Sequence, residues 1–270
     1  FHQRMDRPLR ALGFAAVTGA MISLGSAVVL TRTGDVWLFR GRSGADRAIQ
    51  NLTNSPVNHV GMAIVVEDLP PLMWHAELGR SLPDVWTGRH QRGVQLHDLR
   101  DAVVTWHERY GQRAWLRQLE PMLGREHEDA ALRTVARLDG TPFPSTARLA
   151  TRWARGRMPG AAKAVARARD EATATLRDLV QGRVLDVLRR TYADTDALDG
   201  AAPDVALAEP GLETAYCAEV VAVTYEEMGL LDSERRPNWY DPGRFWSGDR
   251  LPLTGGFRLG GEIAVSVGGR

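Results

Sequence analysis

Short runs of apolar residues in the first half of the chain indicate β-strands rather than helices. Residues 36–40 follow a Gly-Asp turn, and residues 59–66 form a second run that is dense in β-branched side chains. The Pro70-Pro71 pair then predicts a tight reversal into a third strand over residues 72–78. We therefore expect the second and third strands to pair as a hairpin.

Weaker patterns add further elements to this sheet. Residues 93–96 and 114–119 are two more strand candidates, whereas the rest of 79–110 has the character of loop and short helix. Residues 126–138 have helical spacing and end at a turn-rich break. One or two closing strands are expected between residues 257 and 267.

The segment between about 146 and 210 differs in composition from the rest of the chain. Residues 146–192 are rich in Ala and Arg and include an amphipathic helical pattern, and residues 193–211 are acidic and contain Pro and Gly. We interpret the segment as a helical insertion that ends in a surface loop.

Residues 11–30 carry no charge and follow a basic flank. Two interpretations stay open: a signal peptide or membrane anchor, and a buried helix that runs into a strand. We divide the chain into this N-terminal apolar segment, residues 1–32, and one domain over residues 33–270. The first interpretation favours a cell-envelope or membrane-associated location and membrane association through residues 11–30.

Composition limits the classes of function. The 270 residues are 44% hydrophobic and 25% charged, enough for one large domain with its own core. The formal net charge of +1 provides no overall field for nucleic acid, so we expect no nucleic-acid partner. A single cysteine excludes an internal disulfide and a Cys-x-x-Cys motif.

That cysteine, Cys217, lies near the start of a predicted helix. Thr214 is a suitable N-cap, and apolar residues recur at helical spacing until Gly229. In a first helical turn, unpaired N–H groups and the helix dipole favour a thiolate, which is the form of cysteine that acts as a nucleophile. The alternative is a small buried apolar residue.

A thiolate nucleophile needs a histidine as its base, and that histidine needs a polar group to orient it. His59 and His75 qualify because each interrupts an apolar strand of the expected hairpin, although a lone strand histidine is also a common core residue. The remaining histidines are expected on the solvated surface: His2, His90, His97, His107 and His127.

The sequence gives little support for a metal or cofactor site. The His75-x-Glu77 spacing matches the start of the zinc deaminase signature, but the Pro-Cys-x-x-Cys half is missing. His-Glu-x-x-His, Gly-x-Ser-x-Gly and Walker A motifs are also missing from the sequence. We expect neither a metal nor a cofactor.

The order of these motifs resembles the permuted papain-like amidases of the YaeF/YiiX group, relatives of the NlpC-type cell-wall peptidases and the lecithin–retinol acyltransferases. In that family histidine precedes cysteine in the chain, as it does here. The resemblance covers residues 33–143 and 212–267 and rests on four segments: residues 34–39, 58–62, 74–76 and 216–221 with 228–231 behind it.

The resemblance implies that Cys217 is the nucleophile, His59 the base and His75 the orienting third member. Glu77 is an alternative third member, because it shares a strand face with His75. The implied fold is α+β, a circularly permuted papain-like domain in which an antiparallel sheet packs on the cysteine-bearing helix. Departures from the family pattern are the insertion and Ala218, which stands where serine is frequent.

The implied reaction is acyl transfer through a thioester. Hydrolysis of an amide in a cell-wall peptide or a lipid conjugate is the first expectation, with a small peptide or lipid-like substrate as partner. Lipid acyl transfer or thioester hydrolysis of the lecithin–retinol acyltransferase type stays open. So does a non-enzymatic lipid- or peptide-binding module on the same fold. The sequence does not indicate an oligomeric state.

Overall fold

The computed structural model describes residues 21–42, 46–47, 50, 55–77, 79–142, 216–232, 235, 237–247 and 251–268. The strands are β1 (Met21–Ser23), β2 (Val36–Arg40), β3 (His59–Ile64), β4 (Leu72–Glu77), β5 (Gly93–Asp98), β6 (Arg113–Arg117), β7 (Leu119–Glu120), β8 (Arg258–Leu259) and β9 (Ile263–Ser266). The helices are α1 (Leu24–Leu30), α3 (Leu99–Tyr110), α4 (Arg125–Leu138) and α7 (Cys217–Glu227), with 3-10 turns η1 (Pro237–Trp239) and η2 (Pro242–Phe245).

Within these residues, seven strands form one sheet in the order β1-β9-β6-β2-β3-β4-β5. β1 runs parallel to β9, and every other neighbouring pair is antiparallel. The expected hairpin is confirmed: β3 pairs with β4 from Met62 opposite Trp74 to Ile64 opposite Leu72. β7 and β8 form a separate two-stranded sheet.

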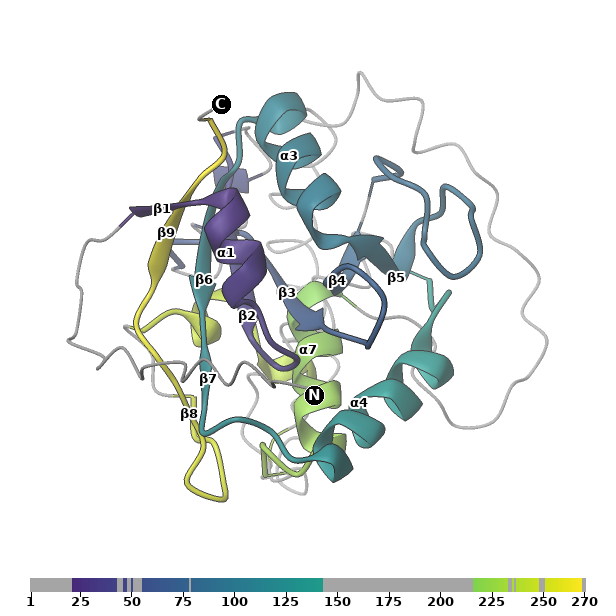
Figure 1. Ribbon diagram of the computed structural model, residues 1–270, viewed down its shortest axis with the longest axis vertical. Helices are drawn as coiled ribbons and strands as arrows, with labels where there is room; N and C mark the ends of the chain where they lie inside the picture. Colours follow the sequence, from purple (N-terminus) through teal and green to yellow (C-terminus); the bar gives the residue numbers. More distant parts are fainter. Residues whose placement is uncertain are drawn as a thin grey trace, which may run out of the picture.

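Helix α7, which begins at Cys217, packs against β3 and β4 on one face of the large sheet (Figure 1). Strand alternation directs Val60, Met62 and Trp74 toward this helix, where they join its buried valines in one core. The Trp74 indole donates a hydrogen bond of 3.0 Å to Thr224 Oγ1, which links β4 to α7. The predicted α+β class, with an antiparallel sheet packed on the cysteine-bearing helix, is therefore confirmed.

Helices α1 and α3 cover the opposite face of the sheet (Figure 1). The second set of alternating residues forms a separate core here with Leu99 and Trp106 of α3, and includes Trp37, Phe39 and Ala63. Helix α3 is longer than the short helix expected from the sequence. Asp98 caps its start by accepting from the Asp101 N–H, and Gly111 ends it with φ +62°. The sheet thus separates two apolar layers.

The described part of the N-terminal apolar segment is folded onto this structure. β1 adds to the edge of the sheet beside β9, and Leu24 and Ala27 of α1 are buried against the α3 layer. Among the described residues, no helix combines the length and apolar character needed to cross a bilayer. The predicted helical insertion at about 146–210 lies outside the described residues.

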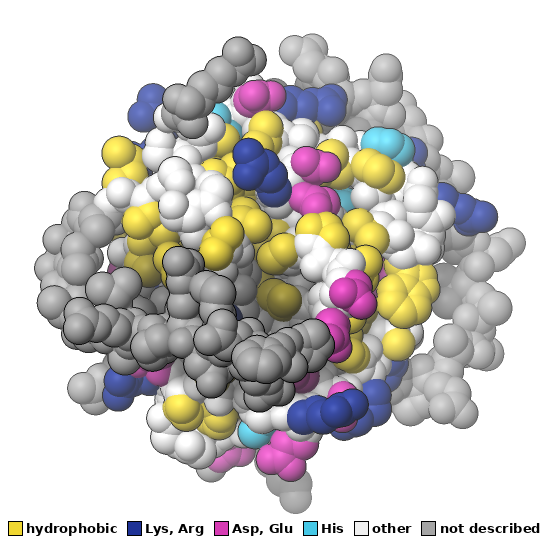
Figure 2. Space-filling model, in the orientation of Figure 1, with side chains coloured by type: hydrophobic (Ala, Val, Ile, Leu, Met, Phe, Trp, Pro, Cys, Tyr) yellow, Lys and Arg dark blue, Asp and Glu magenta, His cyan; other side chains and the backbone are white. Residues whose placement is uncertain are grey.

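On the face of the molecule seen in Figure 2, acidic and basic side chains are interspersed rather than gathered into one charged patch. This pattern agrees with the nearly equal counts of 34 basic and 33 acidic residues in the chain.

Candidate active site

The two histidines predicted from the sequence lie in direct contact. His59 begins β3 and His75 lies within the neighbouring strand β4, and the Nε2 atom of His59 is 3.1 Å from the Nδ1 atom of His75. The rings meet edge to face at 88° with centroids 5.2 Å apart. The hairpin therefore brings this predicted pair together by a side-chain hydrogen bond.

A third histidine continues the contact. His97 of β5 has its Nδ1 atom 3.1 Å from the Nε2 atom of His75, and both side chains are completely buried. The sequence-based expectation that His97 lies on the solvated surface is therefore wrong. β5 extends beyond Leu96 to Asp98, and this extension turns His97 to the same face of the sheet as Gln95, toward Trp106.

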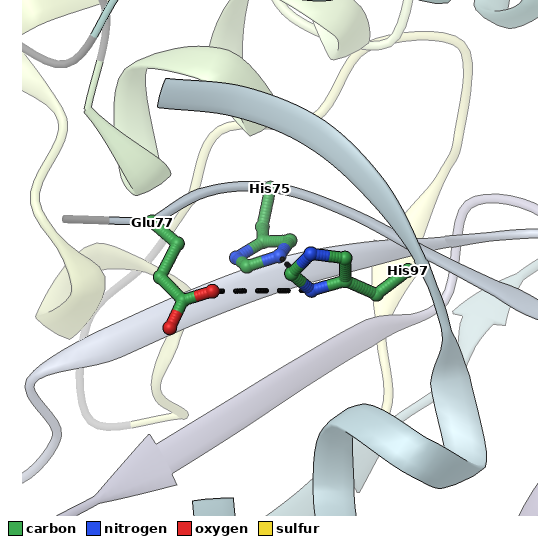
Figure 3. Close-up of side chains that lie close together, drawn as sticks. All are labelled: His75, Glu77 and His97. Carbon is green, nitrogen blue, oxygen red and sulfur yellow. Dashed lines mark hydrogen bonds and ion pairs between the residues drawn. The ribbon is translucent and has the colours of Figure 1, made fainter. Parts of the chain in front are cut away.

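Glu77 closes the cluster at the other end (Figure 3). Its Oε2 atom is 4.0 Å from the Nδ1 atom of His97, and its Oε1 atom accepts a hydrogen bond of 2.8 Å from Ser81. Burial raises the pKa of the Glu77 carboxyl, against the hydrogen bonds from Ser81. Glu77 therefore contacts His97 rather than His59, and no hydrogen bond joins it to the predicted base.

Trp106 of α3 covers the cluster from the adjoining layer. Its ring centroid lies 4.9 Å from His75 and 5.2 Å from His59, and its indole N–H donates to Ser81 Oγ. Because Ser81 in turn donates to Glu77, one hydrogen-bonded series connects the tryptophan to the carboxylate. Neither Trp106 nor Ser81 was expected from the sequence, where both lie in a segment interpreted as loop and short helix.

Burial keeps the three imidazoles neutral at physiological pH. It lowers the pKa of His59 to about 3 and of His97 to about 4, and that of His75 well below its ordinary value. Desolvation is the largest cause for each ring, and the repulsion between neighbouring rings adds to the shifts of His59 and His75. Each ring therefore carries one proton and has one nitrogen free to accept.

Two proton arrangements satisfy both bonds of this histidine chain. In one, His59 donates from Nε2 to His75 and His75 donates from Nε2 to His97, which leaves His59 Nδ1 unprotonated. In the other, both donations run from His97 toward His59, and His59 Nδ1 carries the proton. Only the first arrangement equips His59 as a base at Nδ1.

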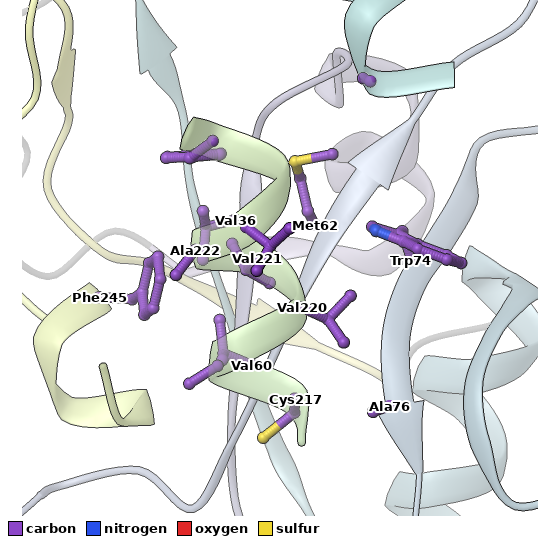
Figure 4. Close-up of a cluster of buried hydrophobic side chains, with 14 of the residues drawn as sticks. Val36, Val60, Met62, Trp74, Ala76, Cys217, Val220, Val221, Ala222 and Phe245 are labelled. Carbon is purple, nitrogen blue, oxygen red and sulfur yellow. The ribbon is translucent and has the colours of Figure 1, made fainter. Parts of the chain in front are cut away.

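Cys217 is the first residue of α7 and lies in the core on the other side of the sheet (Figure 4). Tyr216 occupies the N-cap position without a side-chain bond to the helix start, because its hydroxyl donates to the Tyr240 carbonyl, and the predicted cap Thr214 lies outside the described residues. Burial raises the pKa of the Cys217 thiol to about 11, although backbone hydrogen bonds from Val60 and Ala218 oppose the shift. The expected resting thiolate is therefore wrong, because desolvation outweighs the helix terminus.

The sulfur and the histidine pair belong to different faces of the sheet. His59 packs beside Phe39 and Trp106 in the α3 layer, whereas Cys217 belongs to the core cluster that contains Val60 and Ala76. Among the described contacts of Cys217, none joins its sulfur to an imidazole nitrogen. The sulfur is instead near the backbone of Val60, the residue after His59, whose N–H opposes the rise of the thiol pKa.

Val60 lies in the part of β3 that is not paired with β4. The paired part of β3 and β4 ends at Met62 opposite Trp74, so His59 and Val60 extend beyond it. Val60 has no β4 partner in this register, and its N–H opposes the rise of the thiol pKa. His59 is also the one member of the three-histidine chain that is partly exposed to solvent.

No protein-family model and no curated protein matches the chain. Among solved structures, one that it resembles is metalloprotein YiiX from Escherichia coli O157:H7, DUF1105, with 17% sequence identity and a TM-score of 0.40. The match covers 73% of this chain and 66% of that one, slightly under two thirds of the relative's length. We therefore base the functional proposal on the geometry of the site.

Proposed function

We propose that this protein is a cysteine hydrolase that cleaves an amide, in a cell-wall peptide or a lipid conjugate, through a thioester on Cys217. The observation that carries the proposal is the arrangement of two successive residues of β3. His59 is held by His75 through its Nε2 atom at 3.1 Å, and the backbone N–H of the next residue, Val60, lies on the side of the Cys217 thiol and opposes the rise of its pKa. A cysteine at the start of a helix and a hydrogen-bonded histidine on the strand beside that helix are the components of a thiol acyltransfer site.

In the proposed reaction, one proton moves from the Cys217 thiol to His59 and then to the leaving amine. His59 Nδ1 takes the thiol proton while the sulfur attacks the carbonyl carbon, and the tetrahedral oxyanion is stabilised by backbone N–H groups in the first turn of α7. His59 then returns the proton to the amine as the C–N bond breaks. Water, deprotonated by the same nitrogen, attacks the thioester and releases a carboxylic acid and the free thiol.

In this mechanism His75 is a positioning residue. By accepting from His59 Nε2, it selects the arrangement that leaves His59 Nδ1 unprotonated, and by donating to His97 it completes the chain. Because the resting thiol is neutral, the proton moves only when substrate is present. Proton transfer also requires the His59 ring to turn from the α3 layer toward the open end of the hairpin, so the bond to His75 sets the tautomer of His59 in the resting protein.

The test is hydrolysis of a panel of activated esters, aryl amides and muropeptides by the full chain. We expect measurable turnover that is lost in Cys217→Ala and in His59→Ala. His107→Ala is the matched control, because His107 is exposed at the end of α3 and bonds only the Gln112 carbonyl among the described residues. Full activity in Cys217→Ala would rule out the nucleophile. Tight substrate binding without turnover would favour the binding-module alternative.

A further inference from the structure

Three potential metal-binding atoms converge in the buried cluster on the α3 side of the sheet. The side chains of His75, Glu77 and His97 each offer one such atom, and these atoms all lie within 4.8 Å of one another. Figure 3 shows the carboxylate and the two imidazoles turned toward one another from the neighbouring strands β4 and β5. Residues 75 and 77 share a strand face, and the β4–β5 register brings His97 diagonally beside His75.

The spacing of these atoms suits a tetrahedral ion. Ligand atoms around tetrahedral zinc lie about 3.4 Å apart when each metal bond is about 2.1 Å long. Here His75 Nε2 is 3.1 Å from His97 Nδ1, and His97 Nδ1 is 4.0 Å from Glu77 Oε2. The third separation, between His75 and Glu77, is within 4.8 Å, so side-chain shifts of up to about an ångström would place all three atoms around one ion.

An independent observation is that one oxygen of the cluster has no hydrogen-bond donor. The Oε2 atom of Glu77 is buried without a hydrogen-bond partner, in a residue that is only 9% exposed, and it points toward His97. A buried carboxylate oxygen with no partner is costly, since its desolvation is not compensated. A cation between this oxygen and the two imidazole nitrogens would compensate it.

Hydrogen bonds from neighbouring groups hold these three side chains in place, as they commonly do for metal ligands. Ser81 donates to the other oxygen of Glu77, and the second nitrogen of His75 is bonded to His59. Outer hydrogen bonds of this kind fix the ring orientation and the tautomer of metal-ligating histidines. Trp106 packs against both rings, and neither His75 nor His97 is exposed to solvent.

From this arrangement we propose that His75, Glu77 and His97 bind a divalent transition-metal ion, with zinc as the first candidate. Imidazole nitrogen is a poor ligand for Mg²⁺ and Ca²⁺ but suits Zn²⁺, Co²⁺, Ni²⁺ and Cu²⁺. Two histidines and one glutamate leave a fourth position for water or another ligand. The expectation of no metal, which followed from motif spacing alone, did not include His97.

The site has a consequence that rests on the proposed function. A metal on His75 Nε2 leaves the proton of that ring on Nδ1, where it is donated to His59 Nε2. His59 then carries its own proton on Nδ1 and cannot accept one from Cys217. Metal loading would therefore suppress the hydrolase, and chelation would restore it.

The experiment is a titration of the full, chelator-treated chain with Co²⁺, followed by displacement with Zn²⁺. We expect one equivalent of Co²⁺ to give the visible absorption of a tetrahedral site and Zn²⁺ to remove it. His97→Ala and the isosteric Glu77→Gln should each weaken Zn²⁺ binding at least tenfold, in calorimetry on protein shown to be folded by circular dichroism. Glu77→Gln keeps the experiment decisive if His97→Ala does not fold.

His107→Ala and Cys217→Ala are the controls, and both should bind as the parent protein does. Failure to bind one equivalent, or unchanged binding in Glu77→Gln, would overturn the proposal, as would loss of binding in Cys217→Ala. Metal binding is measured without substrate, so its result does not depend on whether the protein has hydrolase activity. An active enzyme that binds no metal would refute only this inference, and a metal-binding protein without turnover would refute only the proposed function.

Discussion

The imidazoles of His59 and His75 share a hydrogen bond of 3.1 Å across two antiparallel strands, under the ring of Trp106. This contact fixes which nitrogen of each ring is engaged and leaves Nδ1 of His59 for other chemistry. It also couples the two candidate sites, because His75 bonds His59 on one side and His97 on the other.

Replacing His59 and replacing His75 should lower the activity to different extents. His59→Ala removes the proposed base, and we expect kcat to fall by roughly 100- to 10,000-fold. His75→Asn keeps an acceptor for His59 and should retain more activity than His75→Ala, because only orientation is lost. Steady-state kinetics would show this order, and equal activity in the two His75 variants would contradict a positioning role.

The reactivity of Cys217 should report a neutral resting thiol. With its pKa raised from 9.0 to about 11, the thiolate fraction near pH 8 is about a hundredfold below that of an unperturbed thiol. Alkylation by iodoacetamide should therefore be slower in the folded chain than in urea, and its rate should rise with pH up to about 11. Mass spectrometry measures both rates; rapid alkylation that levels off below pH 8 would show an activated thiolate instead.

Gly61 should be intolerant of a side chain. A Cβ atom there would lie 2.4 Å from the Met73 sulfur, and Met73 is completely buried. We expect Gly61→Ala to lower the free energy of unfolding by about 1–3 kcal/mol through overpacking. Combining it with Met73→Ala should give less destabilisation than the sum of the two changes, which urea denaturation would detect; strict additivity would mean that the two residues do not compete for space.

The bond between Trp74 and Thr224 should stabilise the contact of α7 with the sheet. Thr224→Val keeps the shape but leaves the buried Trp74 N–H without an acceptor, at a cost of about 1–3 kcal/mol. Thr134→Val in α4 is the matched control, because the one partner of the Thr134 hydroxyl among the described residues is the Ala130 carbonyl of its own helix. Denaturation midpoints that shift equally would refute a specific role for the Trp74 bond.

Much of the sheet could be predicted because its strands are buried on both faces and therefore stand out as short apolar runs. Residues 36–40 are confirmed as β2, and the 59–66 and 72–78 runs correspond to β3 and β4. The Pro70-Pro71 reversal made these strands neighbours, which placed His59 beside His75. Cross-strand neighbours of this kind follow from local pattern alone, without knowledge of the rest of the chain.

The site was harder to predict where it depends on long-range contacts. His97 was missed because the strand was expected to end at Leu96, although the alternation of Val94, Gln95, Leu96 and His97 continues to it. The pKa of Cys217 depends on its burial among residues far away in the chain, so helix position alone gave the wrong sign. The placement of Cys217 and His59 on opposite faces of the sheet likewise depends on how α7 and α3 pack, which no local pattern specifies.

The central claim is that Cys217 carries the acyl group. It is tested most directly by intact-mass measurement of the full chain quenched with acid during turnover of an activated acyl ester. We expect an added acyl mass on Cys217 that hydroxylamine removes, that is absent from Cys217→Ala and that persists in His107→Ala. Turnover of the same ester with no adduct on Cys217, at full rate in Cys217→Ala, would contradict it.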